Sequence, residues 1–300
     1  MSKFSPSEAA LEGFRLTRER PGLIATWAGL YFLGIMLLIL TMGAALGPQF
    51  VALMRESGGQ IEDTDALGDL LAQSWPAFII VASVAVFFWS MLKAAIYRSI
   101  LRPEDSRFAY VRIGMDEVRL AVGQVVLGAI GILFLIGLDF PLSVLRAGGH
   151  PSMWLLAAVI VVGMVWMGIR LSLTMPLIFY EKKVNFMSPW NLSKGSFWSI
   201  LGMCVLSLIF YIMIFILVYI LMTIIVALSG GMEAVKNISR LTPVSLAAFI
   251  ITSVIVPMIM PVIQAVTINA PFAVAYGELA GVPTPHGRRA LETTPVEANV

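Results

Sequence analysis

Long apolar stretches without a charged residue dominate the sequence. Six stretches contain no Asp, Glu, Lys or Arg, and they cover residues 21–54, 70–92, 120–138, 147–169, 195–232 and 241–277. A bilayer with a hydrocarbon core of about 30 Å is crossed by about 20 apolar residues in a helix, and each stretch is close to that length or longer. The pattern predicts six transmembrane helices, near residues 23–47, 76–97, 118–138, 152–177, 199–228 and 244–272.

Polar and apolar residues follow a helical pattern before the first span. Residues 5–8 (Ser-Pro-Ser-Glu) have the form of a capping box with proline at the first helical position, and Leu11 and Phe14 then fall on one face. We expect residues 1–22 to form a short amphipathic helix at the inner membrane surface. A solvated helix without membrane contact is the alternative. A Ser-Pro pair at residues 188–189 predicts another such helix before the fifth span.

The predicted fold is an all-α, polytopic membrane protein built from three helical hairpins. The hairpins join spans 1 and 2, 3 and 4, and 5 and 6, and each is entered through a cytoplasmic amphipathic segment. Residues 23–277 form the six-helix membrane domain. Residues 278–300 are rich in proline and polar residues and are expected to be a disordered cytoplasmic tail. The acidic segment 48–75 is expected to be a solvated outer loop.

The composition supports a membrane protein and excludes other broad classes. Hydrophobic residues make up 59% of the 300 residues and charged residues 13%, which is about half the charged share of soluble proteins. This excludes a soluble enzyme, a disordered protein and a disulfide scaffold. The single cysteine, Cys204, excludes an intrachain disulfide and a cysteine-based metal cluster.

Basic residues are concentrated on one side of the predicted membrane. With six spans, the N-terminus, the loops 98–117 and 178–198 and the C-terminal tail share one side. Together with Lys93, Arg119 and Arg170 at the adjoining ends of the spans, this side holds 16 of the 20 Lys and Arg residues. Short loops rich in Lys and Arg stay in the cytoplasm. We therefore expect both termini to be cytoplasmic, and we expect no cleavable signal peptide.

No arrangement of residues in the sequence predicts catalysis. The two histidines, His150 and His286, have no neighbours at metal-ligand spacing, and the sequence contains neither a Gly-rich phosphate loop nor a Ser-His-Asp set. No acidic residue lies deep in a predicted span, whereas proton-coupled transporters generally bury Asp or Glu in mid-membrane. We therefore expect no enzyme activity, no cofactor, no bound metal and no nucleic-acid partner.

Basic and aromatic residues near the inner ends of the spans form the first candidate site. Side chains that extend to the lipid headgroups explain them without a function. The functional interpretation is a basic pocket between helices that holds an anionic lipid headgroup or a phosphate. The residues in this set are Lys93, Arg98, Arg102, Arg170, Trp190 and Lys194.

Polar residues and prolines inside the spans form the second candidate set. Gln124, Gln264 and Asn269 either make interhelical hydrogen bonds, worth about 1 kcal/mol each, or line a cavity. A proline inside a helix removes a backbone hydrogen bond and bends the chain. The predicted kinks are at Pro176, Pro257, Pro261 and Pro271.

Three short motifs carry a family resemblance. Residues 170–176 read Arg-Leu-Ser-Leu-Thr-Met-Pro, residues 188–198 read Ser-Pro-Trp-Asn-Leu-Ser-Lys-Gly-Ser-Phe-Trp, and residues 97–105 read Tyr-Arg-Ser-Ile-Leu-Arg-Pro-Glu-Asp. They resemble uncharacterised bacterial inner-membrane proteins related to the membrane domain that precedes some glycerophosphodiester phosphodiesterases. Here Pro189 is inserted, and a serine replaces the threonine of the family motif. The resemblance implies a six-helix fold in the bacterial inner (plasma) membrane. It implies no reaction, because this sequence contains no phosphodiesterase barrel.

The sequence favours a lipid-interacting membrane protein, either a scaffold or a lipid-handling unit. The amphipathic cytoplasmic helices, the basic inner ends and the lack of buried acids support this hypothesis. The alternative is a secondary transporter or flippase for a small or amphiphilic substrate, supported by the prolines and the polar residues of the spans. A third hypothesis is a subunit that docks another membrane protein or a second copy through Gly43 and Gly47.

Overall fold

The described part of the chain is helical. The computed structural model describes residues 5–56, 74–228 and 243–282, and no β-strand occurs within these ranges. In order, the chain forms helices α1 (Pro6–Glu19), α2 (Pro21–Glu56), α4 (Trp75–Leu101), α5 (Met115–Arg146), α6 (Met153–Leu171), α7 (Thr174–Glu181), α8 (Met187–Leu192), α9 (Phe197–Leu228), α11 (Pro243–Ile250) and α12 (Val256–Ala280).

Six helical stretches in the described ranges are long and apolar enough to cross a membrane. Each of them overlaps one predicted span, so the prediction of six membrane-length helices in an all-α protein is confirmed. The stretches are Pro21–Pro48, Trp75–Leu101, Arg107–Arg146, Met153–Glu181, Phe197–Ala227 and Leu246–Ala280.

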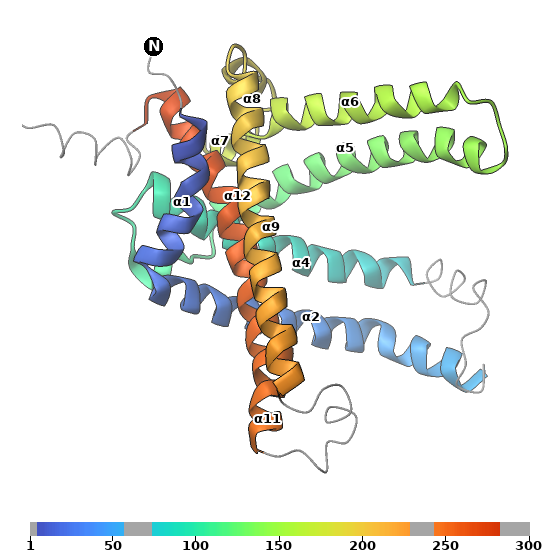
Figure 1. Ribbon diagram of the computed structural model, residues 1–300, viewed down its shortest axis with the longest axis vertical. Coiled ribbons are helices and arrows are strands. Elements are labelled where there is room, and N and C mark those ends of the chain that lie inside the picture. The colour runs from blue at the N-terminus through green and yellow to red at the C-terminus, as the bar shows by residue number, and fades with distance from the viewer. Residues whose placement is uncertain (1–4, 57–73, 229–242, 283–300) are drawn as a thin grey trace, which may run out of the picture.

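The long helices are arranged in two directions. Figure 1 shows α2, α4, α5 and α6 side by side, with α9 and α12 running across one end of this group. Helices that follow one another in the chain are in contact, α2 with α4, α5 with α6, and α9 with α12. Helix α12 also contacts α2 and α4, and therefore joins the two groups.

Two irregularities in the helices lie next to prolines. Helix α6 ends at Leu171, and α7 begins at Thr174. The ring of a proline clashes with the carbonyl group four residues earlier, and for Pro176 that group belongs to Ser172, inside the interruption. A π-helical turn, Ile251–Ile255, directly precedes the segment that contains Pro257. Pro261 and Pro271 lie within the continuous α12.

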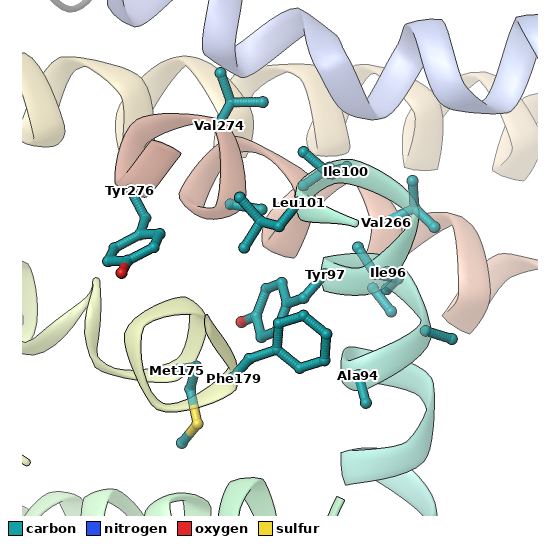
Figure 2. Packing of buried hydrophobic residues seen from close by; sticks show 14 of the residues in the cluster. Ala94, Ile96, Tyr97, Ile100, Leu101, Met175, Phe179, Val266, Val274 and Tyr276 are labelled. Carbon is teal, nitrogen blue, oxygen red and sulfur yellow. The ribbon is translucent and has the colours of Figure 1, made fainter. Parts of the chain in front are cut away.

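Buried side chains gather where the two groups of helices meet. We call this region the hub; it comprises the buried residues of α1 and α7, the C-terminal parts of α4, α6 and α12, and the starts of α2, α5 and α9. Figure 2 shows the rings of Tyr97 and Phe179 next to each other where α4 meets α7, with their centroids 6.0 Å apart. In α12 the buried residues begin at Val262, immediately after Pro261. Pro261 therefore lies at the boundary of the hub, whereas Pro176 and Pro271 are buried within it.

Helix α1 docks into the hub through small residues. Leu11 is 38% exposed, whereas Ala9 and Gly13 are buried. A Cβ atom on Gly13 would lie 2.7 Å from the Cα atom of Thr267 in α12, so the two backbones approach closely. Of the predicted apolar face, Leu11 stays exposed, whereas Phe14 packs edge to face on Phe210 of α9 with ring centroids 5.2 Å apart. Ser5 makes no side-chain hydrogen bond to the backbone of α1, so the Ser5 half of the predicted capping box does not form.

Away from the hub, the long helices expose apolar side chains. Leu133 of α5, Leu155 of α6 and Leu217 of α9 are each about 70% exposed, at 69%, 72% and 68%. None of the residues in the most apolar 18-residue stretch of α9 is buried. Such surfaces are suited to contact with lipid. The segment 57–73 of the predicted acidic loop and residues 283–300 of the predicted tail lie outside the described residues.

A methyl group on Gly13 is expected to destabilise the hub. The Gly13→Ala variant should lower the free energy of unfolding by about 1–3 kcal/mol, because the new Cβ overlaps a backbone atom of α12. The control is Gly29→Ala, since a Cβ atom there meets no atom within 4 Å. The control should be neutral, or stabilising by up to about 1 kcal/mol. Thermal unfolding in mild detergent, followed by tryptophan fluorescence, measures both. Equal midpoints for the two variants would contradict the docking of α1.

Candidate functional site

The six basic and aromatic candidates make three separate sets of contacts. Arg98 and Arg102 at the end of α4 contact α5 and α7, Lys93 contacts α5, and Arg170 of α6 contacts Trp190 of α8. Lys194, the sixth candidate, is exposed. The predicted basic pocket is thus divided into groups that differ in their charge balance.

Arg98 is neutralised inside the hub. Its side chain is 3% exposed, and its Nη2 atom donates to Oε1 of Glu117 at 2.8 Å. Its Nη1 atom donates to the carbonyl oxygen of Tyr110. The carboxylate of Glu117 is 1% exposed. A buried ion pair of this kind has a structural role, because each charge compensates the desolvation of the other.

The contact to Tyr110 fixes a strained turn between α4 and α5. Phe108, Ala109 and Tyr110 have φ angles of 51°, 55° and 65°, in the left-handed region that costs L-residues roughly 1–2 kcal/mol each. The turn is held by Nε1 of Trp27, which donates to the carbonyl oxygen of Ala109 at 2.8 Å. Arg20 donates to the Tyr110 hydroxyl group at 3.0 Å. The start of α2, the turn and the end of α4 are thereby joined.

Arg102 is also compensated, but less completely than Arg98. Its guanidinium carbon lies 5.0 Å from the ring centroid of Phe179 and 5.7 Å from that of Tyr180. Its Nη2 atom donates to the carbonyl oxygen of Tyr180 at 3.0 Å. Its Nη1 atom lies 3.8 Å from a carboxylate oxygen of Asp116. Arg102 therefore connects α4, α7 and the first turn of α5.

Lys93 lies inside α4, five residues before Arg98. Its Nζ atom donates to Oε1 of Gln124 in α5 at 3.2 Å. No carboxylate of the described residues lies within salt-bridge distance of this ammonium group. Gln124 thus serves as an interhelical hydrogen-bond acceptor, and the charge of Lys93 has only a neutral partner.

Arg170 lies in a cluster of aromatic residues. Its guanidinium carbon is 5.8 Å from the ring centroid of Trp166, 5.7 Å from that of Trp190 and 6.0 Å from that of Phe197. Its Nη1 atom is 3.5 Å from the hydroxyl oxygen of Ser193. We call these five residues the Arg170 box. Among the described residues no carboxylate forms an ion pair with Arg170, and its Nε atom is buried without a hydrogen-bond partner.

The remaining polar candidates have different environments. Asn269 accepts a hydrogen bond from the Tyr97 hydroxyl group at 3.3 Å and donates to the carbonyl oxygen of Ala265 at 2.7 Å. Gln264 is exposed. A cavity of about 210 Å³ lies between α5 and α6, and Leu127 and Phe134 are among the residues that line it. None of the three polar candidates lines this cavity. Two of the three, Gln124 and Asn269, therefore serve as partners in contacts between helices.

Several residues of these contacts are not predicted from the sequence. Glu117 borders the third predicted span and gives no sign of its pairing with a residue of another helix. Phe197 lies at the start of the fifth span, where aromatic residues are common for other reasons. Trp166 had a usable signal, because it precedes Arg170 by four residues and such pairs meet on one helix face.

Comparisons with known proteins assign no family to the chain. No family model, no curated protein and no solved structure matches it. The resemblance to the membrane domain of glycerophosphodiester phosphodiesterases stays a prediction. Within the described ranges, no group of three or more His, Cys, Asp or Glu residues is arranged to hold a metal ion.

Removing one member of the buried ion pair is expected to be costly. Glu117→Gln leaves Arg98 buried without a counter-charge, and should lower the free energy of unfolding by about 3–5 kcal/mol. Asp105→Asn is the matched control, because Asp105 forms a 2.8 Å pair with Arg112 in which both side chains are over a third exposed. That change should cost less than about 1 kcal/mol.

Thermal unfolding in detergent compares the two variants directly. The double variant Arg98→Met with Glu117→Leu should be more stable than Glu117→Gln alone, because it leaves no unpaired charge. A Glu117→Gln midpoint within experimental error of that of Asp105→Asn would show that the pair is not a structural element.

Proposed function

We propose that this protein is an integral membrane protein without catalytic chemistry that binds membrane lipids, as a scaffold or a lipid-handling unit. The supporting observation is a contrast between two kinds of cation. Arg98 lies 2.8 Å from the carboxylate of Glu117, and Arg102 lies 3.8 Å from that of Asp116. Lys93 and Arg170 lie in membrane-length helices and have no carboxylate partner among the described residues.

A cation without a counter-ion is expensive at the edge of a hydrocarbon layer. Charged side chains in membrane helices are rare, and they pair with other groups or mark binding sites. Anionic lipid headgroups are the abundant source of negative charge next to the basic ends of membrane helices. A lipid headgroup is therefore the partner that best balances the charges of Lys93 and Arg170.

We further propose that the hub faces the cytoplasm of a bacterial inner membrane, with both termini on that side. Basic residues favour this orientation, because Lys182, Lys183 and Lys194 lie exposed in the segments that connect α6 to α9. In this topology the pairs α2–α4, α5–α6 and α9–α12 are the three hairpins. Helix α1 then lies at the inner surface, docked on α12 and α9.

The bilayer places a condition on the crossing helices. Membrane spans tilt by about 0–40° from the bilayer normal, so α9 and α12 have to turn relative to the other four helices in Figure 1. Pro257, Pro261 and the π-helical turn Ile251–Ile255 lie where α12 leaves the hub. Bends in helices occur at such features, and we propose that α12 bends there.

A secondary transporter or flippase is the second candidate function. The observation in its favour is the π-helical turn Ile251–Ile255 within the stretch Leu246–Ala280, because such turns occur frequently at functional sites. Asn269, in the same helix, is hydrogen-bonded to Tyr97. The mainly apolar lining of the cavity between α5 and α6 favours lipid contact over a polar substrate path.

Loss of the two unpaired cations is expected to reduce bound anionic lipid. Native mass spectrometry of protein extracted in mild detergent should show several-fold less anionic lipid on the Lys93→Ala, Arg170→Ala double variant than on the wild type. The control, Arg112→Ala with Lys183→Ala, removes two exposed charges and should retain wild-type lipid content. Unchanged lipid content in the first double variant would refute the proposed function.

The proposed orientation predicts which positions are reachable from outside the cell. In a Cys204→Ser background, a membrane-impermeant maleimide should label His150→Cys in intact spheroplasts, because His150 lies exposed in the turn between α5 and α6. Glu104→Cys and Lys183→Cys, both exposed at the hub end, should be labelled only after lysis. Labelling of Glu104→Cys before lysis would reverse the orientation.

A further inference from the structure

The guanidinium group of Arg170 has unused hydrogen-bond donors. A guanidinium group carries five N–H donors in a planar fork. In the Arg170 box, the only hydrogen bond from this group within the described residues is the 3.5 Å contact from Nη1 to Ser193. The Nε atom is buried and makes none. This donor set remains available for a ligand with several oxygen acceptors.

The aromatic residues of the box hold the guanidinium group but do not neutralise it. Trp166 and Trp190 pack edge to face, with centroids 5.0 Å apart and an interplanar angle of 88°. Each cation–π contact supplies about 0.5–2 kcal/mol, but the rings are neutral and add no negative charge. The rings also carry no anionic oxygen that could accept from the fork. The box therefore has a fixed cation whose charge is not balanced.

The planar fork selects the chemistry of the ligand. Arginine binds carboxylate and phosphate groups through two parallel N–H···O bonds, and such charge-assisted bonds are stronger than neutral ones. A phosphate group offers more oxygen acceptors than a carboxylate and so satisfies more of the free donors. Lys194, which follows Ser193 in the chain, is exposed and carries a second positive charge in the same segment.

The position of the box favours a phosphate that is attached to lipid chains. Arg170 is the last residue but one of α6. Trp166, one turn earlier, is 42% exposed, and Val162 and Val165 on the adjoining turn are 68% and 48% exposed. The box thus reaches the apolar outer surface of the helix, where acyl chains pack. Tryptophan at this position is also typical of the headgroup level of a membrane.

We propose that the Arg170 box binds the phosphate group of a phospholipid that enters from the bilayer. Arg170 donates to the phosphate oxygens, the three rings fix the guanidinium plane, and the acyl chains lie along the exposed face of α6. This inference rests on the proposed lipid-binding function and names its site and ligand class. An inorganic phosphate ion has the same headgroup chemistry but lacks the chains.

Native mass spectrometry of protein in nanodiscs that contain phosphatidylglycerol tests the site. The wild type should retain one phospholipid that survives gas-phase activation. Arg170→Gln should lower that retention at least tenfold, because the charged fork is lost. Arg170→Lys keeps the charge without the fork, and its retention should lie between the two. The control Arg112→Ala should match the wild type, because Arg112 is paired with Asp105 at the surface.

Two further measurements separate the possible results. If Arg170→Gln does not fold, Arg170→Lys decides the matter, and wild-type retention by that variant would overturn the proposal. Millimolar inorganic phosphate should not displace the retained lipid. Displacement by inorganic phosphate would show a site for the free ion and would overturn the assignment to phospholipid.

The same experiment distinguishes failure of this inference from failure of the proposed function. If Arg170→Gln retains its lipid while Lys93→Ala with Arg170→Gln loses it, the protein binds lipid at Lys93 and the Arg170 box is not the site. If neither variant loses lipid, both the site and the lipid-binding function are wrong. Loss of lipid in the single variant Arg170→Gln supports both the Arg170 box as the site and the lipid-binding function.

Discussion

The buried ion pair between Arg98 and Glu117 is the contact on which the hub depends. In a lipid environment, apolar side chains gain little from leaving the lipid for another helix, so close packing and polar contacts decide which helices associate. The long helices accordingly expose apolar side chains away from the hub, and most of their buried side chains lie within it. Arg98 connects α4 to the first turn of α5 and, through Tyr110, to the strained turn between them. The close approach of Gly13 to α12 adds the N-terminal helix to the same assembly.

Arg98 and Arg170 each lie near the C-terminal end of a membrane-length helix, but they have different roles. The charge of Arg98 is compensated within the protein by Glu117, and both side chains are buried. Arg170 is held by aromatic rings that supply no counter-charge, and it has free donors at the apolar surface of α6. The proposed function follows from this difference in charge balance rather than from the number of basic residues. In this proposal a lipid headgroup provides the negative counter-charge for Arg170, as Glu117 does for Arg98.

The membrane-length helices were predictable because the thickness of the hydrocarbon layer fixes the length of an apolar helix, and that length is visible in the spacing of charges. The interruption near Pro176 was predictable for a similar local reason, since proline removes a specific backbone bond. The docking face of α1 was not predicted, because the close approach at Gly13 depends on a residue of α12 more than 200 positions away. The division of the basic residues was also hidden, because the sequence does not show which of them has a carboxylate on a neighbouring helix. The left-handed turn at Phe108 has no glycine to indicate it.

An experimental structure of the protein in nanodiscs that contain phosphatidylglycerol would test the central claim most directly. The claim is that the paired cations hold the fold and that the unpaired cation of the Arg170 box binds lipid. We predict phosphate density within hydrogen-bond distance of the Arg170 guanidinium group, together with an intact contact between Arg98 and Glu117 that no lipid enters. A protein carboxylate in contact with Arg170, or lipid phosphate at Arg98 in place of Glu117, would contradict the account.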